Sequence, residues 1–329
     1  MERNKLAIIV PAYKINFLSE TFQSISSQTC LDFNLYVFDD ASPYDIRGLY
    51  ERFFCKWKNA SYFRFSQNKG GENLAEQWNR CFYHIGDEEW VWLFSDDDVM
   101  DKCCVENFHQ TLNSANNKIQ DVLHFDIVQI DGTGCITRVM NPYPPDITAA
   151  QYFAGLHLGL FDTRMPEFIF RKEKLSQING FVSFDLAWKS DNATVTAMTY
   201  PGTIHTIPDA KVYWRLSNQN VTGSFIDYMG EERKRLSTIQ YFNWTYLFFK
   251  EKEEWCGLNN TQLYRAYCCC LNRNDKHILH SVVELSHQFL EIDSWVKRLH
   301  FWKAWLLFEF KGQKITYSFK RFWYIFFHM

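Results

Sequence analysis

The chain has 329 residues, of which 47% are hydrophobic and 22% are charged, and its formal net charge is −3. These values are typical of a folded globular protein of about two domains, and they exclude a disordered chain. The small negative charge gives no reason to expect a nucleic-acid partner. The ten cysteines form no CxxC pair and no zinc-binding spacing, so we expect reduced thiols in a cytoplasmic, reducing compartment.

The first hundred residues alternate between short apolar runs and amphipathic segments. The runs that read as buried strands are residues 6–10, 34–38, 62–65 and 90–94. Pro11 is expected to end the first strand. Residues 18–25 and 74–85 carry apolar side chains at helical spacing. Buried strands that alternate with helices predict an α/β fold with a mostly parallel sheet.

Polar residues follow three of these strands. The segments Pro11 to Tyr13, Asp39–Asp40 and Asp96–Asp98 each come directly after a strand. In parallel α/β sheets, ligands bind beyond the carboxyl ends of the strands. We therefore expect these three segments to meet at one edge of the sheet.

The triplet Asp96, Asp97 and Asp98 closes an aromatic strand. Two like charges about 4 Å apart repel by roughly 4 kcal/mol at an effective dielectric constant near 20. Solvent or a bound cation must offset that repulsion. A helix cap is the alternative explanation, although one aspartate would satisfy a cap. Mg²⁺ and Mn²⁺ bind carboxylates together with substrate phosphates, so the triplet predicts a site for one of these ions beside a diphosphate.

Asp39 and Asp40 also have two interpretations. They lie before Ala41 and Ser42, as is typical of a turn, but carboxylates at a sheet edge also accept hydrogen bonds from a base or ribose. No GxGxxG pattern follows the first strand, which disfavours a Rossmann dinucleotide site.

The pattern changes after about residue 120. Strands are expected in 121–131, 166–171 and 203–217, with a helix near 190–200. We predict one domain over residues 1–222, with a nucleotide half (1–120) and an acceptor half (121–222). A helical region rich in aromatic and basic residues is predicted over 223–329.

The C-terminal region combines aromatic and basic side chains. Trp295, Leu299, Trp302 and Leu306 form a helical stripe near several lysines and arginines. Such a helix either packs on its own domain or contacts an anionic membrane surface, here the inner face of the cell membrane. No window reaches the roughly 18 apolar residues of a membrane-spanning helix.

Several motifs together resemble those of family 2 glycosyltransferases. They are VPAYK (10–14), SISSQT (24–29), FDDAS (38–42), NKGGENLAEQWNRC (68–81) and LFSDDDVM (93–100), and YWRLS (213–217) is similar to the closing strand of the family. The resemblance covers roughly residues 4–110. It implies the GT-A fold, a Rossmann-like, mostly parallel sheet flanked by helices, here with a helical C-terminal extension. It also implies a nucleotide-activated sugar as donor.

The resemblance implies a role for each matching residue. Pro11, Ala12 and Tyr13 would line the base, with Tyr13 stacking on it. Asp40 would bind the base, expected to be uracil, and Asp39 would support it. Three further residues would border the nucleotide-sugar: Lys69, Asn73 and Asn79.

The segment SDDDV resembles the DxD-type metal motif of the family. Its register is ambiguous, because Ser95 stands where many members have the first acid. Asp97 and Asp98 would hold Mn²⁺ or Mg²⁺, with Asp97 in direct contact, and Asp96 would bind the nucleotide-sugar, with Asp96 and Asp98 near the ribose and sugar.

The general base of the family is an acid on the acceptor side, roughly ninety residues beyond the metal motif. Asp191 has this position, with a helix N-cap as the alternative reading and Asp185 as the nearest competitor. Trp214 and Arg215 are further candidates to line the acceptor or the diphosphate.

The resulting prediction is an inverting, non-processive, metal-dependent transferase. It would move a sugar from a UDP-sugar to a glycan or lipid-linked acceptor in surface polysaccharide synthesis. The chain lacks the QxxRW motif of processive synthases. Two alternatives are a sugar nucleotidyltransferase, which expects a glycine-rich loop near the first strand, and a non-catalytic nucleotide- or glycan-binding module.

Overall fold

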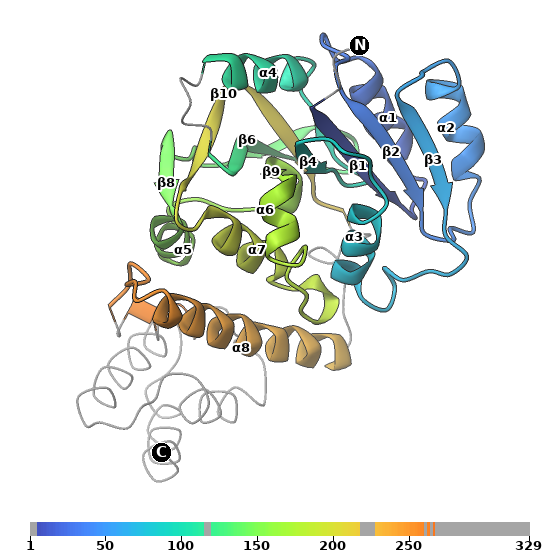
Figure 1. The fold of residues 1–329 in the computed structure, drawn as a ribbon. Coiled ribbons are helices and arrows are strands. Elements are labelled where there is room, and N and C mark those ends of the chain that lie inside the picture. Colours follow the sequence, from blue (N-terminus) through green and yellow to red (C-terminus); the bar gives the residue numbers. More distant parts are fainter. Residues whose placement is uncertain (1–4, 115–119, 218–227, 260–261, 264–265, 267–329) are drawn as a thin grey trace. The chain divides into compact units, whose positions relative to one another are not determined.

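The computed structural model describes residues 5–114, 120–217, 228–259, 262–263 and 266 (Figure 1). The chain divides into two compact units, Met1–Ala149 with Phe161–Phe225 and Ala150–Leu160 with Ile226–Met329. The first unit covers most of the predicted domain over residues 1–222, except that Ala150–Leu160 groups with the second unit. The aromatic stripe predicted at 295–306 lies outside the described residues.

The first unit is built on one ten-stranded sheet, in the order β3-β2-β1-β4-β9-β6-β10-β5, with β7 paired to β6 and β8 to β10. The strands are β1 (Leu6–Ala12), β2 (Asn34–Asp39), β3 (Ala60–Arg64), β4 (Trp90–Leu93), β5 (Val99–Met100), β6 (Val122–Ile130), β7 (Ile136–Val139), β8 (Asp146–Thr148), β9 (Phe168–Arg171) and β10 (Thr203–Arg215). The first four strands in this order are parallel, and β9 runs antiparallel between β4 and β6. The predicted α/β fold is confirmed.

Helices cover both faces of this sheet (Figure 1). Those of the first unit are α1 (Leu18–Ser26), α2 (Ile46–Phe54), α3 (Leu74–Phe82), α4 (Cys104–Ser114), α6 (Lys172–Gln177) and α7 (Ser190–Thr199), with 3-10 turns η1 (Met165–Glu167) and η2 (Asp185–Ala187). Apolar side chains of α1, α2 and α4 share one buried cluster with alternate residues of β1 and β4. On α3, Trp78 and Phe82 pack edge-on against Phe181. Strands covered on both faces need apolar residues throughout, which explains the continuous apolar runs.

The first strand does not end at Pro11, contrary to the prediction. β1 continues to Ala12, with Pro11 opposite Phe38 of β2. Pairing of β1 with β4 stops at Ile9. Proline lacks an N–H donor, and the strand tolerates it here because only one neighbour pairs with β1 at this level.

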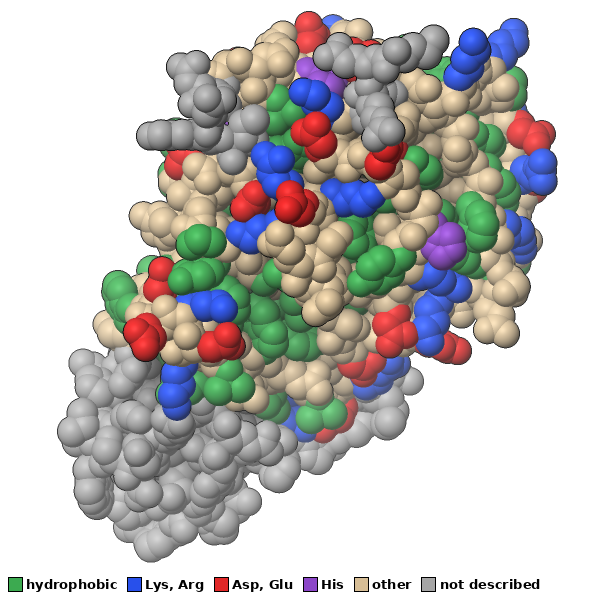
Figure 2. All heavy atoms as spheres, viewed as in Figure 1, with side chains coloured by type: hydrophobic (Ala, Val, Ile, Leu, Met, Phe, Trp, Pro, Cys, Tyr) green, Lys and Arg blue, Asp and Glu red, His purple; other side chains and the backbone are tan. Residues whose placement is uncertain are grey.

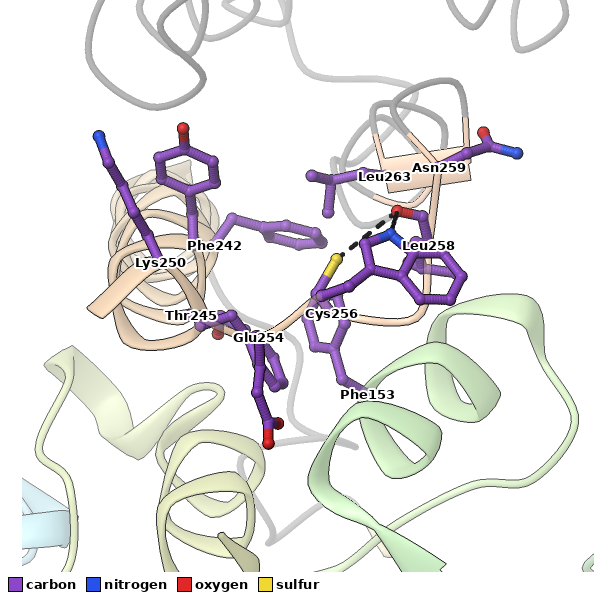
Figure 3. A pocket seen from close by; sticks show the side chains of 12 residues that line it. Phe153, Phe242, Thr245, Lys250, Glu254, Cys256, Leu258, Asn259 and Leu263 are labelled. Carbon is purple, nitrogen blue, oxygen red and sulfur yellow. Dashed lines mark hydrogen bonds between the residues drawn. The ribbon is translucent and has the colours of Figure 1, made fainter. Parts of the chain in front are cut away.

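The described part of the second unit contains most of α5 (Ala149–Leu158) and α8 (Tyr228–Glu251). Phe153 packs against Phe242 and Phe249. A pocket beside α8 is lined mainly by such aromatic and aliphatic side chains, with Lys250 and Glu254 also on its wall (Figure 3). Among the described helices, none has a stretch long and apolar enough to cross a bilayer.

The surface carries both signs of charge. On the face drawn in Figure 2, lysine and arginine side chains are interspersed with aspartate and glutamate. Mixed charge of this kind accords with the small net charge of the chain.

Candidate active site

The carboxyl ends of β1, β2 and β4 meet, as predicted. The backbone N–H groups of Tyr13 and Lys14, which follow β1, donate to Asp96 Oδ2 at 3.0 and 2.9 Å. Ser42, after β2, donates its hydroxyl to the carbonyl of Tyr13 at 2.7 Å. These bonds join three loops that are distant in sequence, because parallel strands deliver their ends to one edge of the sheet.

Lys14 lies between two of the three aspartates. Its Nζ is 3.1 Å from Asp96 Oδ1 and 2.7 Å from Asp97 Oδ2. Burial alone would lower the pKa of Lys14, but the two carboxylates outweigh it and the pKa is raised. Burial, then the charge of Asp96, raises the pKa of Asp97, while Lys14 opposes that rise. An ammonium group therefore supplies the cation that the clustered carboxylates require.

Asp98 points into the protein interior. Its Oδ1 accepts the backbone N–H of Arg215 at 2.8 Å, and it is 1% exposed. Burial, followed by the charge of Asp97, raises the pKa of Asp98 well above its ordinary value. The Arg215 side chain donates to the carbonyls of Asp97 (2.8 Å) and Asp131 (2.9 Å) and to the carboxylate of Glu20 (2.6 Å). Arg215 is fully buried, so the prediction that it lines the acceptor or the diphosphate is wrong. Its side chain instead supports the backbone of Asp97 from the protein interior.

Asp39 is buried among donors at the end of β2. Its carboxylate accepts hydrogen bonds from Ser42 N at 2.7 Å and from Tyr62 Oη at 2.5 Å, and it forms an ion pair with Arg64. Burial, together with the bond to Asp39, raises the pKa of Tyr62 to about 12. Asp39 thereby holds β3 and the loop after β2 together, and its predicted support of the base stays a prediction.

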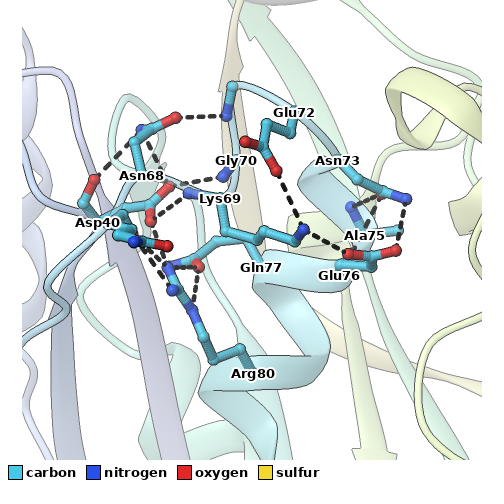
Figure 4. A network of polar contacts seen from close by, with 12 residues as sticks. Asp40, Asn68, Lys69, Gly70, Glu72, Asn73, Ala75, Glu76, Gln77 and Arg80 are labelled. Atoms are coloured by element: carbon cyan, nitrogen blue, oxygen red, sulfur yellow. Dashed lines mark hydrogen bonds and ion pairs between the residues drawn. The ribbon is translucent and has the colours of Figure 1, made fainter.

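Asp40 forms the centre of a polar network (Figure 4). It accepts from the backbone N–H groups of Lys69 (2.9 Å) and Gly70 (2.7 Å), from Asn68 Nδ2 (3.2 Å) and from Arg80. A Cβ at position 70 would lie 2.8 Å from Asp40 Oδ2, so this approach needs glycine. Four donors use the roughly four lone-pair sites of a carboxylate. A nucleotide base would have to displace one of them, so these contacts do not support the base-binding role predicted for Asp40.

Lys69 and Asn73 lie at the start of α3. Lys69 Nζ is 3.0 Å from Glu72 and 3.1 Å from Glu76. Asn73 is the N-cap of α3, and its side chain accepts from the backbone N–H groups of Ala75 and Glu76. If Asn73 contacts the nucleotide-sugar as predicted, it does so while its side chain also caps α3.

Asn79 connects α3 to the acceptor half. Its side chain donates to the carbonyl of Phe181 at 2.8 Å and accepts the Phe181 N–H at 2.7 Å. The preceding Gly180 has φ +87°, and a Cβ there would lie 2.2 Å from Asn79 Oδ1. The structure thus places Asn79 where it fixes the loop before α7.

Asp191 lies in the first turn of α7, but it is not the N-cap, so that alternative is wrong. The N-cap residue is Lys189, at φ 70°, and Asp191 Oδ1 accepts the N–H of the adjacent Asn192, at 2.8 Å. The residue is half-buried. Burial raises the pKa of Asp191, while the charges of Lys189 and Arg164 oppose the rise. A half-buried carboxylate with a raised pKa and few protein partners has the properties of a general base.

A buried acid and histidine, which the sequence did not indicate, lie near Asp191. His124 Nε2 is 3.9 Å from Glu167 Oε1, and neither side chain is exposed. Burial lowers the pKa of His124 to about 3 and raises that of Glu167 well above its ordinary value. His124 is therefore neutral at pH 7, and the charge of Asp191 adds to the rise in the pKa of Glu167 that burial causes.

Two of the three aspartates are candidate ligands for a divalent cation. Among the described residues, no three acidic, histidine or cysteine side chains converge on one point. Oxygens of Asp96 and Asp97, however, lie within 3.1 Å of one cationic atom, Lys14 Nζ. Mg²⁺ is commonly held by one or two carboxylates, with phosphate and water as its other ligands. The geometry favours the pair Asp96 and Asp97 over the predicted pair Asp97 and Asp98.

In open α/β sheets, ligands bind beyond the carboxyl ends of the strands, which is where these carboxylates gather. Residues 7–132 match the model of glycosyl transferase family 2. The predicted resemblance is thus found over this part of the chain, and the predicted enzyme class, a glycosyltransferase, is confirmed. The match favours this class over a nucleotidyltransferase or a non-catalytic binding module. No curated protein matches the sequence.

Solved structures share the fold. The crystal structure of S. aureus TarS 1-349 in complex with UDP-GlcNAc has a TM-score of 0.54 at 16% identity, over 93% of this chain and 90% of that one. The mannosyltransferase PcManGT from Pyrobaculum calidifontis, in complex with GDP-Man and Mn²⁺, has a TM-score of 0.50 at 14% identity, over 93% and 85%. At such low identities the similarity establishes the fold alone.

Proposed function

We propose that this protein is an inverting, non-processive transferase that moves one sugar from a UDP-sugar to a hydroxyl group of a glycan or lipid-linked acceptor, with Mn²⁺ or Mg²⁺. The observation that carries the proposal is the convergence of Asp96 and Asp97 on one cation position at the carboxyl edge of a family 2 domain. The structural relatives support a nucleotide-sugar donor, since TarS was crystallised with UDP-GlcNAc and PcManGT with GDP-Man.

The donor side of the site is formed by the loops after β1, β2 and β4. Tyr13 is 41% exposed, so its ring is free to stack on a base. Asp39 and Asp40 shape the surrounding wall, because they hold Ser42 and the Lys69 backbone in place. A metal bound by Asp96 and Asp97 would stabilise the negative charge of the departing diphosphate.

On the acceptor side, Asp191 acts as the base. It removes the proton of an acceptor hydroxyl, whose oxygen attacks the anomeric carbon from the face opposite the nucleotide. The new carbon–oxygen bond forms as the bond to the diphosphate breaks, so the configuration inverts. The proton ends on the Asp191 carboxylate, and the electron pair leaves with the nucleoside diphosphate.

Binding of UDP tests the donor site directly. Calorimetric titration of UDP is expected to show binding that requires Mn²⁺ in the wild type. Asp97→Asn should weaken this binding at least tenfold, because it removes a charged metal ligand. Asp209→Asn is the matched control: Asp209 is exposed on β10 at φ 61°, which asparagine tolerates, so its UDP affinity should equal that of the wild type.

UDP binding that is equally strong without metal, or equally strong in Asp97→Asn, would contradict the metal assignment. If the protein binds GDP but not UDP, only the predicted nucleobase of the donor would change. If no nucleoside diphosphate binds, the assignment of the donor site to these loops is wrong.

The dependence of the transfer rate on pH tests the role of Asp191 as general base. Transfer requires Asp191 to be deprotonated, so the rate should fall as the pH drops through its pKa, which burial places above the ordinary 3.8. The charges of Lys189 and Arg164 lower this pKa. Lys189→Met should therefore move the acid limb to higher pH. A limb at or below pH 3.8, in protein shown to be folded by circular dichroism, would contradict this role.

The cellular setting belongs to the same proposal. A lipid-linked acceptor would place the enzyme in the cytoplasm, at the inner face of the cell membrane, in surface polysaccharide synthesis. The basic and aromatic composition of residues 293–329 supports membrane contact at the level of sequence.

A further inference from the structure

The loop after β1 places a lysine ammonium where the donor site would hold a metal. Lys14 is anchored at both ends. Its backbone N–H donates to Asp96 Oδ2 at 2.9 Å, and its Nζ contacts Asp96 Oδ1 at 3.1 Å and Asp97 Oδ2 at 2.7 Å. Both carboxyl groups are 7% exposed, and the lysine side chain is 26% exposed. This ion pair is therefore largely shielded from solvent.

We infer that Lys14 is the resident cation of the donor site in the absence of nucleotide, and that a divalent cation binds Asp97 only when Lys14 leaves it. The inference rests on the proposed function, in which Asp96 and Asp97 hold the metal. An ammonium group and a divalent ion cannot occupy the same pair of oxygens, and their like charges repel at short distance.

The nucleotide supplies the reason for Lys14 to move. Lysine is a point charge on a flexible four-carbon stem, and it is a common phosphate ligand. Lys14 directly follows Tyr13, the residue proposed to contact the base. A donor diphosphate at this edge therefore gives the ammonium a new anionic partner and frees Asp97. Lys14 is in this sense a positioning residue that couples metal binding to nucleotide binding.

The coupling has a thermodynamic signature. If UDP displaces Lys14 from the aspartates, UDP must raise the affinity of the protein for Mn²⁺, and Mn²⁺ must raise the affinity for UDP by the same factor. Removing the ammonium should leave the aspartates open to the metal without nucleotide. UDP should then raise the Mn²⁺ affinity by a smaller factor.

The test measures Mn²⁺ affinity rather than activity. Mn²⁺ is titrated into the full chain, with and without saturating UDP, and free Mn²⁺ is followed by electron paramagnetic resonance. Without UDP, Lys14→Met is expected to bind Mn²⁺ at least tenfold more tightly than the wild type. UDP should raise the Mn²⁺ affinity of the wild type by a larger factor than that of the variant.

Lys211→Met is the matched control. Lys211 is an exposed residue of β10, so this variant has the same net charge as Lys14→Met with the aspartates unchanged. Its Mn²⁺ affinity should equal that of the wild type. If Lys14→Met is unstable, Lys14→Gln makes the same comparison with a polar side chain.

Two failures can be told apart. If the Lys14 variants bind Mn²⁺ no more tightly than the wild type, while the wild type still binds UDP with Mn²⁺, the inference is overturned and the proposed function stands. If the wild type binds neither UDP nor Mn²⁺ under any condition, the proposed donor site fails and the inference fails with it.

Discussion

Replacing Asp191 by asparagine is expected to reduce turnover by a factor of about 10² to 10⁴, the range typical of losing a general base. The amide has the size of the carboxylate but cannot accept the proton of an acceptor hydroxyl. The fold should survive, because the Asp191 side chain accepts one local bond, from the N–H of Asn192. UDP binding should be unchanged, since the proposed donor contacts come from the loops after β1, β2 and β4.

The measurement is the release of UDP from a panel of UDP-sugars with glycan acceptors, together with calorimetric titration of UDP. The control is Asp185→Asn, which changes the competing acid six residues earlier, in η2. Its turnover should stay close to that of the wild type. If Asp185→Asn lost activity and Asp191→Asn kept more than a tenth of it, the base would have to be reassigned.

Replacing Arg215 by methionine is expected to destabilise the protein by roughly 1–3 kcal/mol, as is typical when buried acceptors lose their donor. Arg215 is fully buried at the end of β10. Its guanidinium donates to the carbonyls of Asp97 and Asp131 and to the carboxylate of Glu20. Methionine fills much of the space, but it leaves two carbonyls without this donor.

Urea denaturation followed by circular dichroism measures this loss. Arg47→Met is the matched control, because Arg47 forms an exposed ion pair with Glu51 on α2 and should change the stability little. UDP affinity should also fall in Arg215→Met, because the backbone of Asp97 loses a support. A loss below about 1 kcal/mol, the net value of one ordinary hydrogen bond, would show that Arg215 does not support the aspartates.

Much of the first unit could be predicted from residue order. Apolar runs such as residues 6–10 and 90–94 became β1 and β4, because strands covered on both faces must be apolar throughout. The meeting of three polar loops at one edge follows from the parallel arrangement of the strands. The resemblance placed Asp191 at the start of a helix, and the alternative that it caps this helix is wrong, because Lys189 is the N-cap.

Only the tertiary structure decided what each carboxylate does. Asp96, Asp97 and Asp98 are adjacent and chemically identical, yet two of them contact Lys14 and the third turns inward to the backbone of Arg215. Those partners lie more than eighty residues away along the chain. Which carboxylate faces Lys14 and which faces the backbone of Arg215 depends on strands that pair across this distance, and local sequence contains no record of that pairing. The sequence by itself thus determined where acids gather, and the packing of β1, β4 and β10 determined which of them pair with a cation.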